Sequence, residues 1–278
     1  MSRGVFAIRN AVGWLAIGGL LLGCGPAVVA HPPASKKNDT LPGDIDVLLA
    51  FAESKAVEDA RLSDLSDAAD AYDKAISLSQ SHPSSMPRAE MNWRLSRVCF
   101  YAAELEKGSA DKLIWIARGE LAATASVDEA PGRVEGYYYL AVLKGRRAQH
   151  SGIGFSAMML AKNVEELGLK SVEIDPTFES GGPYRLLAML YAHAPPWPTS
   201  IGDIDKAIEF ADKAVAVSDY PMNHLVRGEV LVEADENDAA RGELETVLAA
   251  PKSGRWAHEG ESWRPYARQL LTKIESGE

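Results

Sequence analysis

Cysteine is nearly absent from this chain, since its 278 residues contain only Cys24 and Cys99. Two cysteines exclude a disulfide framework, a four-cysteine zinc site and an iron–sulfur ligand set. Positive charge is also scarce, because 29 Lys and Arg stand against 39 Asp and Glu and leave a net charge of −10. Nucleic acid requires concentrated positive charge, so the sequence predicts no nucleic-acid partner. What remains is an acidic chain, 46% hydrophobic and 24% charged, with the composition of an ordinary globular protein.

Catalytic and cofactor motifs are lacking as well. None of the six histidines has another at i+3 or i+4, the spacing that metal ligands on one helix require. The Gly-Ile-Gly sequence at 152–154 lacks the third glycine of a dinucleotide site, and the acidic run at 233–238 lacks the glycine and final glutamate of a calcium loop. Cys99 lies in an expected helix and is interpreted as a buried, inert thiol. The sequence therefore predicts no enzyme, no cofactor and no metal.

The first 23 residues have the pattern of a secretory signal. Two arginines and no acidic residue accompany an apolar run at 11–23, which is shorter than the roughly 20 residues that span a bilayer. The run ends in Leu-Leu-Gly-Cys at 21–24, which resembles the lipobox of bacterial lipoproteins. That resemblance implies a lipoprotein signal peptide at 1–23 and acylation of Cys24 in the cell envelope. Gly25 in place of Asp implies the outer membrane, facing the periplasm.

Three other interpretations of this end remain open, the first being that Cys24 is a chance cysteine with no lipid attached. The Val-Val-Ala sequence at 28–30 is an alternative cleavage site that would release a soluble protein, and residues 11–30 would form an uncleaved anchor if no cleavage occurs. Residues 24–43 contain four prolines and no periodicity. We expect them to form a disordered tether with an r.m.s. span on the order of 25 Å. The folded domain is expected at 44–278.

From residue 44 onward, apolar residues recur at helical spacing. Small side chains lie at matching positions in successive segments, at Ser96, Ala141, Ala188 and Gly228, which are 45, 47 and 40 residues apart. Such a period is typical of a helical solenoid, and small side chains let paired helices approach to about 8–10 Å. The expected fold is all-α, with about five helix pairs and a C-terminal capping helix. The expected pairs are 44–79, 87–128, 133–175, 183–218 and 221–249, with the cap at 262–275.

These repeats resemble those of the tetratricopeptide repeat (TPR) family. The first-helix pattern is matched by Tyr184, Leu187, Ala188 and Tyr191, and the second-helix pattern by Ala68, Tyr72 and Ala75. The spacing exceeds the 34 residues of that family because the connections are longer. The connection at 194–202 contains three prolines within four residues and cannot be helical. Residues Ser200 to Asp203 are expected to open the next helix as a capping box.

A narrower resemblance is to the T-component lipoproteins associated with bacterial TRAP transporters. It rests on Gly-Gly-Pro-Tyr-Arg at 181–185 and Gly-Asp-Ile-Asp-Lys-Ala at 202–207, and it covers about a third of the chain. The resemblance implies a periplasmic protein partner, the solute-binding protein of a TRAP-type transport system. It also implies handling of a small acidic solute, and self-association. The rival hypotheses are a generic TPR scaffold for envelope assembly with no solute ligand, and an enzyme of unrecognised type.

The first helices of such repeats form the inner, concave face. The repeat phase places on that face the residues Trp93, Arg97, Tyr101, Tyr138, Arg146, Arg185, Met189 and His193. Because arginine binds carboxylates bidentately, the first hypothesis is a groove for an acidic partner or solute. It expects reversal of the three arginine charges to abolish capture without unfolding the protein. The alternative is that the arginines pair with acidic residues of neighbouring second helices and only stiffen the solenoid.

Trp197 is a second candidate contact. It lies among three prolines, at 195, 196 and 198, which restrict the backbone. Two interpretations remain open at the level of sequence: an exposed contact site, or a lid tucked over the edge of the solenoid.

Overall fold

The computed structural model describes residues 41–57, 59–150, 155–252 and 256–277. The expected signal peptide at 1–23, Cys24 and the tether up to residue 40 lie outside these ranges. Within them the chain forms eleven helices and no β-strand. The helices are α1 (Ile45–Lys55), α2 (Leu62–Leu78), α3 (Arg88–Leu105), α4 (Ser109–Glu129), α5 (Val134–His150), α6 (Phe155–Ile174), α7 (Phe178–His193), α8 (Ile204–Val217), α9 (Pro221–Glu233), α10 (Asn237–Ala249) and α11 (Trp256–Ser276).

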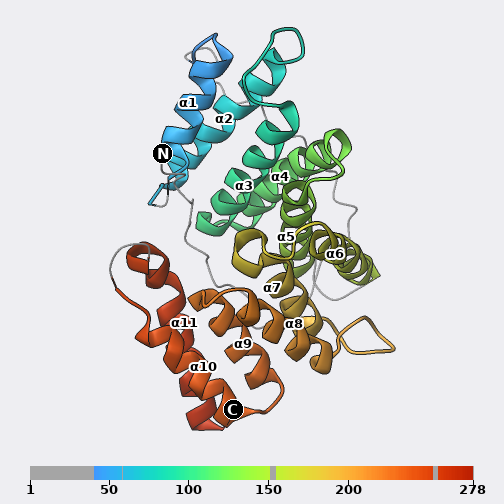
Figure 1. Ribbon diagram of the computed structural model, residues 1–278, viewed down its shortest axis with the longest axis vertical. Coiled ribbons are helices and arrows are strands. Elements are labelled where there is room, and N and C mark those ends of the chain that lie inside the picture. Colours follow the sequence, from blue (N-terminus) through green and yellow to red (C-terminus); the bar gives the residue numbers. More distant parts are fainter. Residues whose placement is uncertain (1–40, 58, 151–154, 253–255, 278) are drawn as a thin grey trace.

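The helices stack in pairs from one end of the molecule to the other (Figure 1). Each helix packs on the next in the chain, and α3, α5, α7 and α9 also contact one another in turn. These four helices therefore form one continuous layer, which we call the first-helix layer. The helix α11 packs on α9 and α10 at the C-terminal end, whereas among the described helices the backbone of α1 lies close to that of α2 alone. The predicted all-α solenoid of five pairs and a cap is confirmed, with the cap beginning at Trp256 instead of residue 262.

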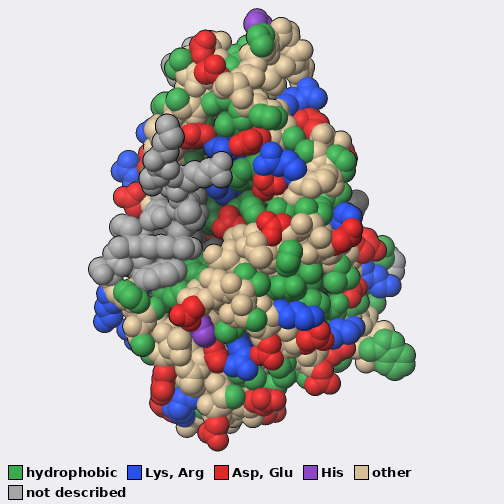
Figure 2. Space-filling model, in the orientation of Figure 1, with side chains coloured by type: hydrophobic (Ala, Val, Ile, Leu, Met, Phe, Trp, Pro, Cys, Tyr) green, Lys and Arg blue, Asp and Glu red, His purple; other side chains and the backbone are tan. Residues whose placement is uncertain are grey.

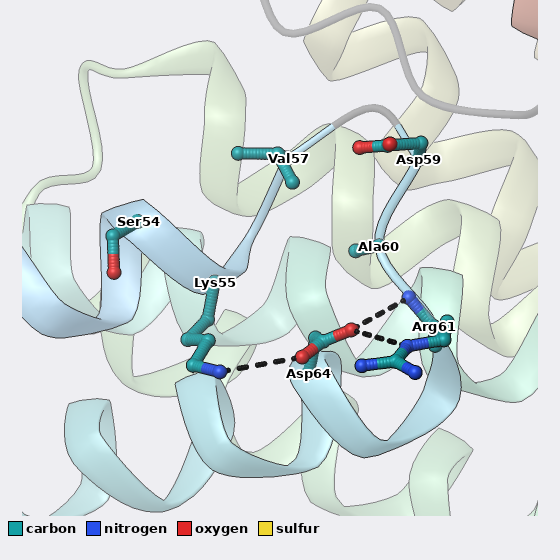
Figure 3. A pocket seen from close by; sticks show the side chains of 7 residues that line it. All are labelled: Ser54, Lys55, Val57, Asp59, Ala60, Arg61 and Asp64. Carbon is teal, nitrogen blue, oxygen red and sulfur yellow. Dashed lines mark hydrogen bonds and ion pairs between the residues drawn. The ribbon is translucent and has the colours of Figure 1, made fainter.

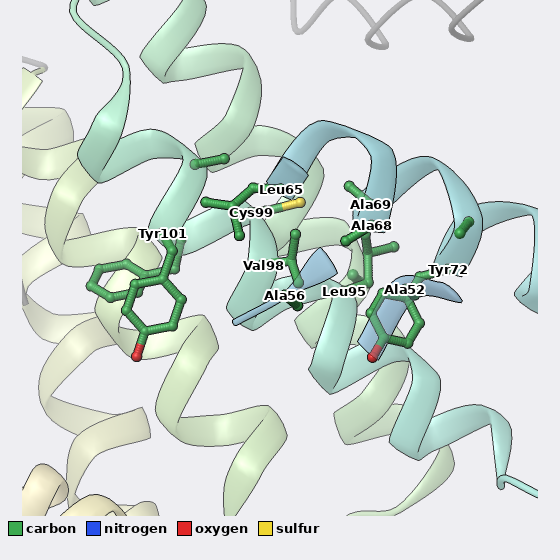
Figure 4. Packing of buried hydrophobic residues seen from close by; sticks show 14 of the residues in the cluster. Ala52, Ala56, Leu65, Ala68, Ala69, Tyr72, Leu95, Val98, Cys99 and Tyr101 are labelled. Carbon is green, nitrogen blue, oxygen red and sulfur yellow. The ribbon is translucent and has the colours of Figure 1, made fainter. Parts of the chain in front are cut away.

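Alanine at the helix crossings explains the close packing. Ala68 and Ala75 of α2 are fully buried, and Tyr72 between them is 1% exposed. They meet Leu95 and Val98 of α3 in a cluster that extends from α1 to α5 (Figure 4). Side chains this small let neighbouring helix axes come close, while tyrosine fills the remaining space.

Two helix starts have specific polar causes. Asp44 caps α1, since its carboxylate accepts the Val47 N–H at 3.0 Å. At the start of α8 the cap is Asp203, whose carboxylate accepts the Lys206 N–H at 3.1 Å. The predicted capping box beginning at Ser200 is therefore wrong: the helix begins three residues later, because Asp203 itself satisfies the free N–H.

The helix α7 begins with a left-handed turn. Glu179, Ser180 and Gly181 have φ values of 49°, 57° and 90°, so regular helix starts at the Gly-Pro pair that follows them. A proline in the first turn of a helix costs no hydrogen bond, which suits Pro183 to this place. Non-glycine residues with positive φ are strained, so other groups have to hold the turn.

Candidate functional site

The structure brings the predicted groove residues together on the first-helix layer. Trp93 and Arg97 lie on α3, and the guanidinium of Arg97 is 4.9 Å from the centre of the Trp93 ring. The Trp93 ring also stacks on the ring of Tyr139 of α5, with the ring centres 6.3 Å apart and the ring planes 6° from parallel. One aromatic and cationic cluster thus links the second and third helix pairs.

A carboxylate from α7 enters this aromatic cluster. Tyr139 donates its hydroxyl to Glu179 Oε1 at 2.9 Å. Burial, and then the charge of Glu179, raise the pKa values of Tyr139 and Tyr101 well above their usual value. Tyr138 packs edge-on against Tyr139 and against Phe178. The buried phenols of Tyr101 and Tyr139 therefore stay neutral, and that of Tyr139 acts as a hydrogen-bond donor.

Arg185 is committed to the fold. It is only 8% exposed, and its guanidinium donates to the carbonyls of Glu179 at 2.7 Å and Ser180 at 2.9 Å, and to Asn223 Oδ1 at 2.6 Å. These bonds hold the left-handed turn that opens α7. Reversing the charge of Arg185 would place a carboxylate against carbonyl oxygens, so the structure argues against a triple reversal that leaves folding intact.

The other polar groove residues are also paired within the molecule. Arg146 binds both oxygens of Glu104, at 2.7 and 3.2 Å. His193 Nε2 lies 2.9 Å from Glu229 Oε1, a carboxylate that is 2% exposed. Both acidic partners lie on first helices, α3 and α9, whereas the stiffening alternative placed them on second helices.

The groove prediction therefore divides by exposure. Tyr101, Arg185 and Met189 are buried, whereas Trp93, Arg97, Tyr138, Arg146 and His193 are partly exposed. Of the five, Arg97 lies beside Trp93, with its guanidinium 4.9 Å from the centre of the ring. Contact of these residues with a partner stays a prediction.

Trp197 stands clear of the molecule. It is 83% exposed, and the connection between α7 and α8 that carries it projects from the body of the solenoid (Figure 1). The connection is fixed at its base, where Gly202 N donates to the Pro195 carbonyl at 2.9 Å and Asp203 N to the Tyr191 carbonyl at 3.0 Å. A lid over the solenoid edge would bury the indole, so the exposed contact is the interpretation that fits this geometry.

Two polar positions, one asparagine and one glutamate, were missed by sequence reasoning. Asn223 is fully buried and donates to the carbonyls of Ser180, Ala214 and Ser218. Glu179 accepts from Tyr139. A polar residue on the apolar face of a helix is the signal that points to Asn223; nothing in the local sequence marks Glu179.

The described residues hold one free cysteine, Cys99. Cys99 is buried, as predicted, and burial raises the pKa of its thiol to about 12.

A hollow of about 530 Å³ lies at the N-terminal end of the solenoid, between α1 and α2, and is lined by Lys55, Arg61 and Asp64 among others (Figure 3). The side chains of Lys55 and Arg61 both form ion pairs with the Asp64 carboxylate, at 3.3 and 3.1 Å. Both positive charges are therefore paired with an acidic residue inside the hollow.

Metal-binding and membrane-crossing features are missing from the same ranges. No group of three or more His, Cys, Asp or Glu side chains there is arranged to hold a metal ion. None of the described helices combines the length and the apolar character that crossing a membrane takes.

A solved structure shares this architecture. A thermophilic TPR protein of Thermus thermophilus superposes with a TM-score of 0.56 over 84% of this chain and 98% of its own, at 14% identity. No protein family profile matches the sequence, and neither does any curated protein. The likeness establishes a TPR-like helical-repeat fold.

Proposed function

We propose that this chain is an exported, lipid-anchored repeat protein that binds a protein partner in the bacterial envelope. The observation that carries the proposal is the continuous first-helix layer formed by α3, α5, α7 and α9. Within that layer Trp93 and Arg97 of α3 lie together with Tyr139 of α5. Solenoids bind extended partners along such layers, and tryptophan and arginine are the side chains that most often anchor a protein interface.

The finer proposal concerns the partner. The resemblance to T-component lipoproteins supports a solute-binding protein of a TRAP-type system, with a small acidic solute passing between the two. Arg97 is the groove cation to test, because its guanidinium lies 4.9 Å from the centre of the partly exposed Trp93 ring, a pairing typical of interface anchors. A generic scaffold for envelope assembly is the competing function, and it needs no solute.

Affinity capture from detergent-solubilised membranes tests the proposal. We compare the wild type with Arg97→Glu, and use Arg241→Glu of α10 as a control with the same change of charge on a second helix. Each variant is first shown to fold by circular dichroism and thermal melting. We expect the wild type and Arg241→Glu to recover one exported partner that Arg97→Glu loses.

Each other result has a definite meaning. Equal recovery by Arg97→Glu overturns the role of the first-helix layer. Recovery of assembly factors in place of a solute-binding protein favours the generic scaffold. Absence of any specific partner overturns the proposed function itself.

A further inference from the structure

The loop at 194–202, which we call the Trp197 loop, is unlike the rest of the surface. Its nine residues include no Asp, Glu, Lys or Arg, in a chain that is 24% charged. Its tip carries Trp197, the most exposed of the large hydrophobic side chains in the described residues. The loop is therefore an uncharged projection on an acidic protein.

The backbone of the Trp197 loop is adapted to leave water. Pro195, Pro196 and Pro198 have no N–H group to desolvate. The N–H groups of Thr199 and Ser200 both donate to the Pro196 carbonyl, at 3.0 and 3.2 Å. Because an unpaired N–H in an apolar medium costs several kcal/mol, roughly 2–7, this internal pairing lowers the cost of burying these two groups in one.

The projecting shape is locked. Residues Pro196 and Gly202 form a bridge across the base of the loop, and a Cβ on Gly202 would overlap the backbone of Ala194. A rigid tip loses little conformational freedom when it inserts into a surface.

A second exposed apolar side chain lies toward the same edge of the solenoid. Met159, in the first turns of α6, is 47% exposed. Tyr191, near the end of α7, donates its hydroxyl to Glu165 of α6 at 2.6 Å, so the start of α6 and the end of α7 lie toward one edge of the solenoid. Met159 is six residues from Glu165 toward that edge, about 9 Å along the helix. Figure 2 shows a hydrophobic group that projects from the molecule where Figure 1 places the connection between α7 and α8, and it shows hydrophobic side chains interspersed with acidic and basic ones on the neighbouring surface.

From these observations we infer that the Trp197 loop inserts into the headgroup region of a neutral, zwitterionic lipid surface. Tryptophan favours that region because its ring is apolar and its N–H meets the headgroups. A protein hot spot is usually enclosed by a rim of further contacts, whereas this side chain stands out alone, which suits a planar and deformable surface. The net charge of −10 makes anionic lipid the less favourable surface. The inference does not depend on the protein partner proposed above.

A fluorophore placed in the loop tests this. In the full chain with Cys24→Ser, the buried Cys99 should not label, so a single new cysteine carries the dye NBD. We place it at Thr199→Cys in the loop or, as the control, at the exposed Thr124→Cys on α4. Vesicles of dioleoylphosphatidylcholine should shift the emission of the loop label to the blue and protect it from iodide at least twofold. The α4 label should not change, and high salt should leave the effect unaltered.

The matched variant decides the role of the indole. Adding Trp197→Ala to Thr199→Cys should abolish the shift, and phosphatidylglycerol vesicles should give a smaller one. The inference is overturned if adding vesicles leaves the emission of the loop label as it is in water alone, whether or not the protein floats with the vesicles. It is also overturned if the α4 label shifts equally or if Trp197→Ala retains the shift. Loss of partner capture by Trp197→Ala without any vesicle response would assign the loop to a protein partner instead.

Discussion

Arg185 Nη1 donates a 2.6 Å hydrogen bond to Asn223 Oδ1, and both side chains are buried between α7 and α9. Each also binds the carbonyl of Ser180, at 2.9 Å from Arg185 and 3.1 Å from Asn223. Two residues 38 positions apart thus bind the carbonyl of Ser180, a residue whose backbone has a positive φ. The left-handed start of α7 is therefore fixed by the following helix pair.

Replacing Asn223 should weaken the whole C-terminal half. Asn223→Ala leaves three backbone carbonyls without this donor and the buried Arg185 without its acceptor, so we expect a loss of about 3 kcal/mol in the free energy of unfolding. Urea titration followed by circular dichroism measures it. The control is Asn237→Ala at the exposed start of α10, which should change stability by less than about 0.5 kcal/mol. Equal effects of the two substitutions would contradict the role of Asn223.

Two glycines within helices should respond to alanine with opposite signs. A Cβ at Gly119 of α4 would lie 2.9 Å from Cys99 Cβ and 2.8 Å from Leu143, whereas a Cβ at Gly242 of α10 meets nothing within 4 Å. Both changes gain up to about 1 kcal/mol of helix propensity. Crowding at Gly119 costs about 1–3 kcal/mol, so only Gly242→Ala should raise the melting temperature. A rise in both variants would show that the α3–α4 crossing relaxes freely.

The Cys99 thiol should resist alkylation in the native protein. Burial raises its pKa to about 12, so almost no thiolate is present at pH 8, and the sulfur is inaccessible. Maleimide labelling followed by peptide mass spectrometry should detect modification of Cys99 only after denaturation. Modification within minutes under native conditions would mean that α3 and α4 separate readily.

Glu120 should make stability depend on pH. Burial raises the pKa of this carboxyl above its usual value, and Oε1 has no hydrogen-bond partner, although Arg147 binds Oε2 at 2.6 Å. A carboxyl whose pKa is higher in the folded state contributes less stability as the pH rises through that folded value. Glu120→Gln removes this dependence.

The expected result is a melting-temperature difference, Glu120→Gln minus wild type, that grows from pH 4.5 to pH 7. Taking the difference cancels carboxylates such as Asp64, whose pKa is lowered by its bonds to Arg61 and which act in the opposite direction. A difference that is constant across this range would mean that Glu120 is ionised without penalty.

Gly202 should control the shape of the Trp197 loop without controlling the fold. Gly202→Ala forces a Cβ into the backbone of Ala194, so the bridge to Pro196 should open. Hydrogen exchange at the Asp203 N–H, which now donates to the Tyr191 carbonyl at 3.0 Å, should accelerate more than tenfold. Trp197→Ala, at an exposed site, should leave that exchange rate unchanged. Unchanged exchange in Gly202→Ala would show that the loop is not held at its base.

The repeat architecture could be predicted because it depends on residue size at fixed spacing. Ala68, Tyr72 and Ala75 mark the buried face of α2 by their i, i+4, i+7 pattern alone, and the same pattern recurs on α8 and α10. Proline and aspartate mark where helices begin and end. All of this is local in sequence, so the five pairs and the cap follow from it.

The partners of the polar residues could not be predicted, because they are distant in sequence. The repeat phase correctly places Arg185 on a first helix, yet it cannot show that the preceding turn is left-handed and directs two carbonyls at the guanidinium. Arg146 similarly meets Glu104, 42 positions away, across the first-helix layer. The sequence therefore places these residues on first helices, whereas it cannot show that Arg146 and Arg185 bind groups within the molecule, and contact of the groove with a partner stays a prediction.

The position of α1 at the edge of the solenoid determines how the molecule responds to a pull at its N-terminal end. Force applied at Leu41 first meets the 2.7 Å bond from Lys74 Nζ to the Leu41 carbonyl, and then α1, which packs on α2 and is tied to α3 by the ion pair between Glu53 and Arg94. The 11 residues of α1 would lengthen from about 16 Å as helix to about 37 Å when extended. Under load the chain would therefore yield about 20 Å of reach by peeling off one helix while the first-helix layer stays whole. A domain attached at this end can therefore lengthen under force by unfolding its first helix before any other.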